Sequence, residues 1–177
     1  MDRVEIPFTK LVLPVMRTYD AQWLLLAAGD FGKRDFNCMT ISWGSLGVVW
    51  NKPFAMVLVR PTRHTWLFME KSDSFTLSAF PEERRAALSY CGSHSGRDED
   101  KVKACGLTPI ASRSVPSPGF DEAELLIECR KMYFADLQPG HFLDPAIEDN
   151  YPRKDYHRVY FGEILAISGT PAWLLKE

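Results

Sequence analysis

The sequence has no apolar run long enough to cross a membrane. Its longest apolar stretches, residues 23–28 and 54–59, fall far short of the ~18 residues that a spanning helix needs. The first residues, Met1–Pro7, lack a basic start followed by an apolar stretch, so no secretory signal is expected. Basic and acidic residues number 21 and 23, and this balance gives no reason to expect nucleic acid or a membrane as a partner. The expectation is a soluble, cytoplasmic protein.

Cysteine is scarce, and the common catalytic motifs are absent. The four cysteines are widely spaced and form no CxxC pair, which favours reduced thiols over disulfides or a metal site. The sequence contains no GxGxxG, GxxxxGK[ST], GxSxG or HExxH, and its histidines lie too far apart for a local metal motif. Cys91 could serve as a nucleophile and His94 as its base, but this spacing of the two residues is common by chance. No catalytic side chain and no metal are predicted, so a bound cofactor would supply any reactivity.

Short strand-like segments separated by tight turns make up most of the chain. The 177 residues are 46% hydrophobic and 25% charged, ordinary values for one globular domain over residues 1–177. Hydrophobic patterning predicts strands at 23–28, 37–43, 48–50, 54–59, 75–80, 122–136 and 157–167, after a loose terminal strand in residues 1–13. Helices are predicted at 64–71, 81–90 and 97–105, and a long loop at 139–152. For residues 121–128 a helix is an open alternative.

This order of elements predicts a mainly β fold with minor α content. Many short strands with a few helices between the middle ones indicate a closed antiparallel barrel that carries the helices at its end. A doubly wound parallel sheet would need a helix after nearly every strand, and the sequence does not provide them. Gly44 and Gly47 flank a short segment where the chain is expected to bend or bulge.

Residues 37–43, Asn-Cys-Met-Thr-Ile-Ser-Trp, are unusually polar for a strand. They carry hydroxyls, an amide and an indole where a plain core strand would be aliphatic, which suggests that a ligand lies against this sheet. Trp43 directly follows Thr40 and Ser42, so it is the aromatic residue we expect beside a planar ligand. The other aromatic residues are more simply explained as core.

Basic and hydroxyl side chains further along the chain suggest a phosphate monoester. Charge combined with short hydrogen-bond donors suits such a group, and the candidates fall in two segments: Arg60, Thr62 and Arg63, then Ser93, Ser95, Gly96, Arg97 and Lys101. Arg97 and Lys101 are four residues apart and would share one helical face beside the free N–H groups of a helix start. The simpler alternative is that both pair with the neighbouring acidic residues 98–100 on a solvated helix.

The chain resembles the flavin reductase-like family of FMN-binding split-barrel proteins, and within it the flavoredoxin-like branch. The matching segments follow the family's order over nearly the whole chain: Asn37-x-Met-Thr-Ile-Ser-Trp-Gly44, Asn51-Lys-Pro-Phe54, Val59-Arg-Pro-Thr-Arg63, Phe75-Thr-Leu-Ser78, Ser93-x-Ser-Gly-Arg-Asp98 with Lys101, and Tyr160-Phe-Gly-Glu-Ile164. The resemblance implies a six-stranded antiparallel split β-barrel that forms a homodimer and holds FMN noncovalently near the subunit interface. It also implies NADH or NADPH as a transient donor and free flavin or a redox protein as an acceptor.

The resemblance further implies roles for the candidate residues. The flavin ring and ribityl chain would be contacted or bordered by residues of the polar strand: Asn37, Met39, Thr40, Ile41, Ser42 and Trp43. Arg60, Thr62 and Arg63 would lie near the ribityl and phosphate groups, and the segment from Ser93 to Lys101 would bind the phosphate. His141, in the long loop, would reach over the flavin from the second subunit.

Two questions stay open at this point. An electron carrier that binds FMN without useful nicotinamide reductase activity is an alternative to a reductase, because no dinucleotide fingerprint is present. Pyridoxal phosphate or haem is less favoured, since no lysine or histidine is clearly placed for that chemistry. Cys38 stands where relatives often have a small residue, and it is expected to be an ordinary buried side chain rather than a reactive thiol.

Overall fold

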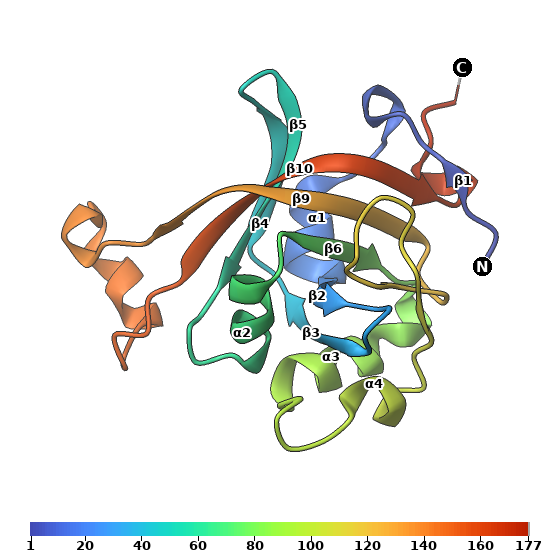
Figure 1. The fold of residues 1–177 in the computed structure, drawn as a ribbon. Helices are drawn as coiled ribbons and strands as arrows, with labels where there is room; N and C mark the ends of the chain where they lie inside the picture. Colours follow the sequence, from blue (N-terminus) through green and yellow to red (C-terminus); the bar gives the residue numbers. More distant parts are fainter. Residues whose placement is uncertain (177) are drawn as a thin grey trace.

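The computed structural model describes residues 1–176, and its main feature is an eight-stranded antiparallel sheet (Figure 1). The strand order is β3-β2-β6-β9-β10-β5-β4, with β1 also paired to β10. The strands of this sheet are β1 Val4–Glu5, β2 Leu24–Asp30, β3 Asp35–Ile41, β4 Gly44–Val49, β5 Lys52–Val59, β6 Ser74–Ala79, β9 Leu125–Asp136 and β10 Arg158–Gly169. A separate antiparallel pair is formed by β7 Pro109–Ile110 and β8 Gly119–Phe120.

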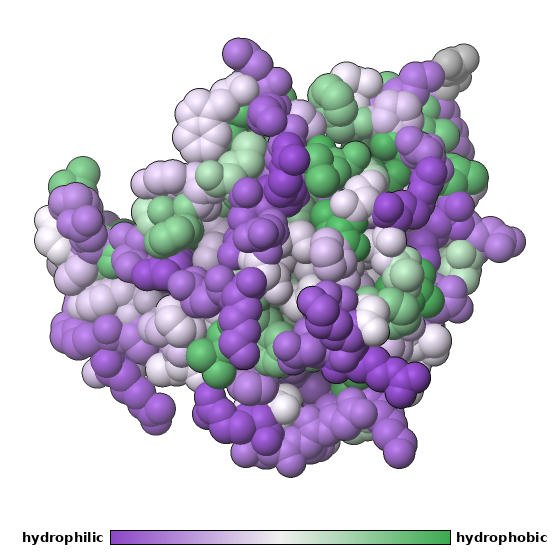
Figure 2. Space-filling view, in the orientation of Figure 1, coloured by the Kyte–Doolittle hydropathy of each residue, from purple (hydrophilic) through white to green (hydrophobic). Residues whose placement is uncertain are grey.

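The helices are short and lie mostly between the middle strands. The α-helices are α1 Val15–Arg17, α2 His64–Lys71, α3 Arg85–Ser93 and α4 Lys101–Ala104. Single helical turns occur at η1 Phe8–Lys10, η2 Thr18–Gln22, η3 Glu82–Arg84, η4 Pro139–His141, η5 Pro145–Asn150 and η6 Pro171–Trp173. Within residues 1–176, none of these helices has the length and hydropathy needed to cross a bilayer. In the view of Figure 2, hydrophilic residues cover most of the surface.

The mainly β, antiparallel class is confirmed, but the closed barrel and the count of six strands are wrong. The segment expected to bend around Gly44 and Gly47 instead forms the full strand β4, which pairs with β5 along its length. The short β1 adds an eighth strand beside the end of β10. The sheet is not closed because β3 and β4 stand at opposite ends of the strand order, and α3 packs against β3.

The core explains why β2 has an uninterrupted apolar sequence. Leu24, Leu26 and Ala28 face the larger hydrophobic cluster, while Leu25 and Ala27 face a second cluster beneath α3. Successive side chains of a strand point to opposite faces, so a strand that is covered on both faces has no position for a polar residue. β3, which contains most of the polar strand, is an edge strand of the sheet and is covered on the same side by α3.

Strands β9 and β10 are the longest and extend beyond the rest of the sheet. Each has 12 residues, and together they carry residues 137–157 away from the body of the molecule (Figure 1). The first half of β9 is buried and the second half largely exposed. The alternative of a helix at 121–128 is wrong, because residues from Leu125 onward pair with β6 and β10.

The helix predicted at 97–105 is also wrong in its extent. Only Lys101–Ala104 is helical, because the Asp100 side chain caps it by accepting a hydrogen bond from the Lys103 amide at 3.1 Å. Residues before Asp100 form turns instead. Arg97 and Lys101 therefore do not share a helical face. Gly106 has a φ of +59° directly after this helix, as expected for a glycine that ends it.

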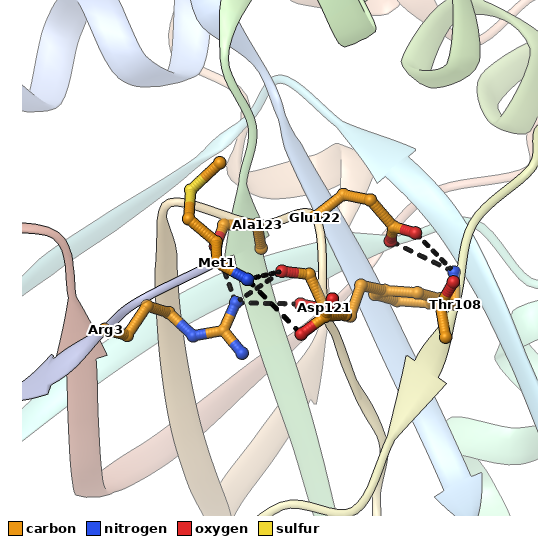
Figure 3. A network of polar contacts seen from close by, with 7 residues as sticks. Met1, Arg3, Thr108, Asp121, Glu122 and Ala123 are labelled. Atoms are coloured by element: carbon orange, nitrogen blue, oxygen red, sulfur yellow. Dashed lines mark hydrogen bonds and ion pairs between the residues drawn. The ribbon is translucent and has the colours of Figure 1, made fainter.

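The N-terminus is tied to the segment before β9 by the Arg3 guanidinium group and by the amino group of Met1, which contacts Asp121 (Figure 3). Arg3 Nη1 donates to the carbonyl oxygens of Phe120, Asp121 and Ala123 at 2.9, 3.2 and 2.6 Å. The Glu122 carboxylate, from the same segment, accepts the Thr108 amide at 3.0 Å through both oxygens. These contacts add to the β7–β8 pair and to the hydrogen bonds of Ser117 with Gly29 and Ser74 in fixing this connection.

We expect Arg3→Met to lower the free energy of unfolding by about 1–2 kcal/mol, because carbonyl groups lose a charged donor. Urea denaturation followed by circular dichroism measures the change. Arg113→Met is the matched control, since the Arg113 side chain makes an exposed ion pair with Glu5 at 3.0 Å, and such pairs contribute little. Equal losses in the two variants would contradict the role given to Arg3.

Candidate functional site

An open cleft lies where β3 ends and the chain turns into β4. Its lining combines the end of the polar strand with residues of β5 and the start of β10: Met39, Thr40, Ile41, Ser42, Trp43, Leu58, Arg60, Arg63 and His157. A second, narrower hollow is lined by the N-terminal part of α2 and by the segment after α3: Met39, Thr62, Arg63, His64, Thr65, Cys91, Gly92, Ser93, His94, Ser95, Gly96 and Lys101. Met39 and Arg63 line both, so the two hollows are neighbours, and together they are called the groove.

The end of the polar strand offers an exposed ring and a free hydroxyl to the open cleft. Trp43 is 43% exposed, and its ring centroid lies 5.1 Å from that of His157. The Ser42 hydroxyl is exposed and makes no hydrogen bond within residues 1–176. Thr40 differs, because its hydroxyl donates to the Leu88 carbonyl of α3. The strand thus presents Ser42 and Trp43 to a ligand, whereas Thr40 anchors the helix.

Lys101 is a buried cation in the narrow hollow. Its residue is only 4% exposed, and Nζ donates to the carbonyl oxygens of Cys91 and His94 at 3.0 and 3.2 Å. Within residues 1–176 no carboxylate lies at ion-pair distance from it. An ammonium group has three N–H donors, so one remains for another acceptor. A buried charge without a counter-charge is costly, and an anion in this hollow would remove that cost.

Arg63 provides a second cation where the two hollows meet. Its Nη1 donates to the Gly92 carbonyl at 3.2 Å, and no carboxylate within residues 1–176 pairs with it. The adjoining backbone at Gly96 is packed tightly, because a Cβ there would lie 2.2 Å from Asn37 Oδ1. The narrow hollow therefore has two cations and a glycine where the chain passes another side chain closely, features that suit phosphate.

Asn37, Arg97 and His141 do not line the groove. The Asn37 amide donates to Thr65 Oγ1 at 2.9 Å, which joins β3 to α2 beneath Gly96. Arg97 is exposed and, with Asn37, lines a third hollow that shares Gly96 and Lys101 with the narrow one. His141 lies in η4 and is exposed. It belongs to residues 137–157, the projecting segment, which β9 and β10 carry away from the body of the molecule (Figure 1). These placements leave Lys101 and Arg63 as the cations that line the narrow hollow.

Arg60 and Thr62 contact the projecting segment and are not free for a phosphate. Arg60 Nη1 lies 3.2 Å from both carboxylate oxygens of Asp155, and Nη2 donates to the Asn150 carbonyl at 2.8 Å. The Thr62 hydroxyl donates to Asp155 at 3.3 Å. The guanidinium also lies 5.1 Å from the ring centroid of Tyr151. Arg60 still forms one wall of the open cleft, with its charge largely compensated.

His157 is a cleft residue that sequence reasoning missed. It precedes β10, whose first residue Arg158 pairs with Val59, so the register brings His157 to the wall formed by Arg60. Its Nδ1 lies 2.8 Å from the Tyr151 hydroxyl. Burial, aided by the positive charge of Arg60, lowers the pKa of His157 from 6.5 to about 4. The imidazole is therefore neutral at neutral pH. Register between the last strand and residues 54–59 is the signal that could have found it.

This lowered pKa predicts a pH-dependent loss of stability. The unfolded chain binds a proton at His157 below a pH near 6.5 and the folded chain only below about 4, so the unfolded state binds more protons between these values. Stability should fall as pH decreases through this window, by about 1–2 kcal/mol after solvent screening is allowed for. The difference between denaturation curves of the native protein and His157→Asn isolates the contribution. Parallel curves from pH 7 to 4 would rule it out.

Comparison with known proteins identifies the family. The model described as "Flavin reductase like domain" matches residues 16–171. The chain belongs to the flavin reductase-like family. This confirms the resemblance found in the sequence, and a flavin-related function follows from membership. No curated protein matches the chain.

Solved structures share the flavin reductase-like fold. Flavoredoxin of Desulfovibrio vulgaris (Miyazaki F) has a TM-score of 0.66 at 21% identity, covering 88% of this chain and 73% of that one. Flavoredoxin from Methanosarcina acetivorans has a TM-score of 0.67 at 22% identity, covering 99% and 79%. An FMN-binding domain of a flavin reductases-like enzyme from Shewanella baltica OS155 has a TM-score of 0.68 at 16% identity, covering 95% and 77%. At these identities the likeness establishes the fold.

Proposed function

We propose that this chain binds FMN noncovalently in the groove and works as a flavin-dependent oxidoreductase. The observation that carries the proposal is the buried ammonium group of Lys101, which has a donor to spare and no carboxylate partner within residues 1–176. Two solved relatives, a flavoredoxin and an FMN-binding domain, support the choice of ligand. FMN carries both a phosphate for the narrow hollow and a planar ring for the open cleft.

The residues present fit such a ligand. Lys101 and Arg63 would hold the phosphate by charge-assisted hydrogen bonds, with Ser93 and Ser95 lining the same hollow. Ser42 offers a hydroxyl near the ring, and Trp43 and His157 supply aromatic walls to the open cleft. The neutral imidazole adds no charge there. FMN, when bound, supplies the hydride- and electron-accepting chemistry, and the protein orients it and leaves one side of the cleft open to a donor.

An absorption spectrum of the purified protein, followed by identification of the released chromophore, tests flavin binding. Added FMN should also raise thermal stability, since a ligand at 100 times its Kd contributes about 2.7 kcal/mol. A colourless protein that gains neither a flavin spectrum nor stability from FMN would refute the proposal.

NADH or NADPH is the donor we propose, with free flavin or a redox protein as the acceptor. The alternative is a flavoredoxin-type electron carrier without significant nicotinamide reductase activity, which is favoured by the two flavoredoxins among the structural relatives. Stopped-flow mixing of the FMN-loaded protein with each nicotinamide separates them. Rapid bleaching of flavin absorbance supports the reductase, and its absence with both nicotinamides supports the carrier.

We further propose a homodimer with the flavin near the subunit interface. Trp50, in the turn after β4, forms an exposed cluster with aromatic side chains of β9 and β10: its ring centroid lies 6.0 Å from that of Tyr133, and Trp50 is 58% exposed. Leu143, on the projecting segment, is 99% exposed. Large exposed apolar groups mark interaction surfaces. Sedimentation equilibrium should give twice the chain mass for the native protein and less for Trp50→Lys, and a native monomer would refute the dimer.

A further inference from the structure

Three of the four cysteines gather behind the narrow hollow. Cys38 of β3 and Cys91 of α3 are fully buried, and Cys105, which follows α4, is half-buried. The sulfur atoms of Cys91 and Cys105 are 3.7 Å apart. Cys91 also lines the hollow, and its carbonyl oxygen accepts a hydrogen bond from Lys101. The three cysteines come from separate parts of the fold, and the flavin chemistry proposed above gives their thiols no role.

The separation of Cys91 and Cys105 is small enough for a covalent bond. A disulfide has a sulfur–sulfur distance of roughly 2.05 Å, so rotation of the two side chains with a slight approach of α4 to α3 would close the gap. Cys105 is the accessible partner, since Cys91 is only 1% exposed. An oxidant would therefore meet Cys105 first, with Cys91 directly behind it.

The chain between these two cysteines lines much of the narrow hollow, where we place the FMN phosphate. It includes Gly92 and His94, whose carbonyl oxygens accept from Arg63 and Lys101, and it includes Lys101 itself. A bond between Cys91 and Cys105 would close this segment into a covalent loop. Such a loop restricts the motion of its members in every state of the chain.

We propose that Cys91 and Cys105 are a redox-active dithiol that hydroperoxides oxidise to a disulfide in the folded protein, clasping residues 92–104 into a closed loop. The Cys105 thiolate attacks the hydroperoxide, whose O–O bond breaks to give a sulfenic acid and an alcohol or water. The Cys91 thiol then attacks this sulfur, the S–O bond breaks, and its proton leaves with the oxygen as water. The two thiols lose two electrons in total, and the hydroperoxide gains them.

The surroundings should make oxidation of this pair slow at neutral pH. Burial raises the pKa of Cys105 to about 12, and Cys91 lies beside it. The hydrogen bond with Cys38, together with burial, raises the pKa of Cys91 as well. Lys101 favours the thiolates and Glu99 opposes that of Cys105, so thiolates are rare at neutral pH. Oxidation accordingly needs excess hydroperoxide.

Peptide mapping tests the pairing without reference to flavin. Trypsin cuts after Arg and Lys unless proline follows, which places the four cysteines in different peptides: Cys38 in 35–63, Cys91 in 86–97, Cys105 in 104–113 and Cys129 in 114–130. After treatment of the folded protein with hydrogen peroxide and blocking of free thiols, peptides 86–97 and 104–113 should appear joined, with the mass of two hydrogen atoms lost. Cys105→Ser should abolish this species, and Cys129→Ser should leave it unchanged.

Hydrogen exchange tests the clasp itself. Amides of residues 92–104 should exchange several-fold more slowly in the oxidised protein than in the reduced one, with no change in β9. The same comparison in Cys105→Ser should show no effect of peroxide. A link between peptides 35–63 and 86–97, no link at all in folded protein, or unchanged exchange in 92–104 would each overturn the proposal.

Discussion

Lys101→Met should weaken FMN binding by roughly 10- to 150-fold, the equivalent of the 1.5–3 kcal/mol that a hydrogen bond to a charged group contributes. Methionine keeps the apolar stem of the side chain within the buried site and removes the ammonium group, which is the charge we assign to the phosphate. Fluorescence titration of the flavin-free protein with FMN measures the affinity. Riboflavin, which lacks the phosphate, should bind both proteins alike.

Lys103→Met is the matched control for this prediction. Lys103 lies in the same short helix two residues further on, but it is exposed and does not line the narrow hollow. Its side chain is not needed for the Asp100 cap, which uses the backbone amide. Lys101→Met also leaves the carbonyl groups of Cys91 and His94 without a donor, so unfolding curves and Lys101→Arg are needed beside it. If Lys103→Met and Lys101→Met weaken FMN equally, the phosphate does not lie at Lys101.

Lys101 and Arg97 show where prediction from the local sequence failed. Their four-residue spacing predicts a shared helical face, but the spacing rule applies only if the intervening residues are helical. The Asp100 side chain caps a helix that begins at Lys101, four residues later than predicted. This moved Arg97 to the surface and left Lys101 buried, and only the three-dimensional arrangement of α3 and α4 decides which of the two cations lines the hollow.

The polar strand was placed correctly because its signal is local. Hydroxyl and indole side chains at its end are visible in seven consecutive residues, and Ser42 and Trp43 do line the open cleft. The residues of the opposite wall of the open cleft could not be predicted from a local pattern. Arg60 meets Asp155, a residue 95 positions away, and this pairing depends on how β5 and β10 align. Such long-range contacts leave no periodic pattern in the sequence.

The same distinction explains the errors in the fold. Most of the longer strands were recognisable from a few consecutive residues, whereas the closure of the sheet depends on which strands pair. β10 pairs with β9 along its whole length and, on its other edge, with β5 near its start and with β1 at its end. Two register shifts in the β9–β10 ladder add curvature, and one of them occurs between Phe161 and Gly162.

Gly162→Ala is expected to lower the free energy of unfolding by about 2–3 kcal/mol, the cost of overpacking a dense core. A Cβ at this position would lie 2.6 Å from the ring of Phe75 and 2.8 Å from Cβ of Cys129. Both of those residues are completely buried, so neither ring nor strand has free space into which to move. Denaturation in urea, followed by tryptophan fluorescence, measures the loss.

Gly140→Ala and a compensating change make this test specific. A Cβ at Gly140 would meet nothing within 4 Å, so this substitution should be neutral or slightly stabilising. Phe75→Leu alone should destabilise the protein by removing buried ring atoms, yet it should make room for the added methyl group in Gly162→Ala. The double variant should therefore lose less stability than the two single losses combined. Strict additivity would mean that Gly162 is needed for the backbone geometry of the bulge and not for the close approach of Phe75, because a smaller neighbour relieves only a steric conflict.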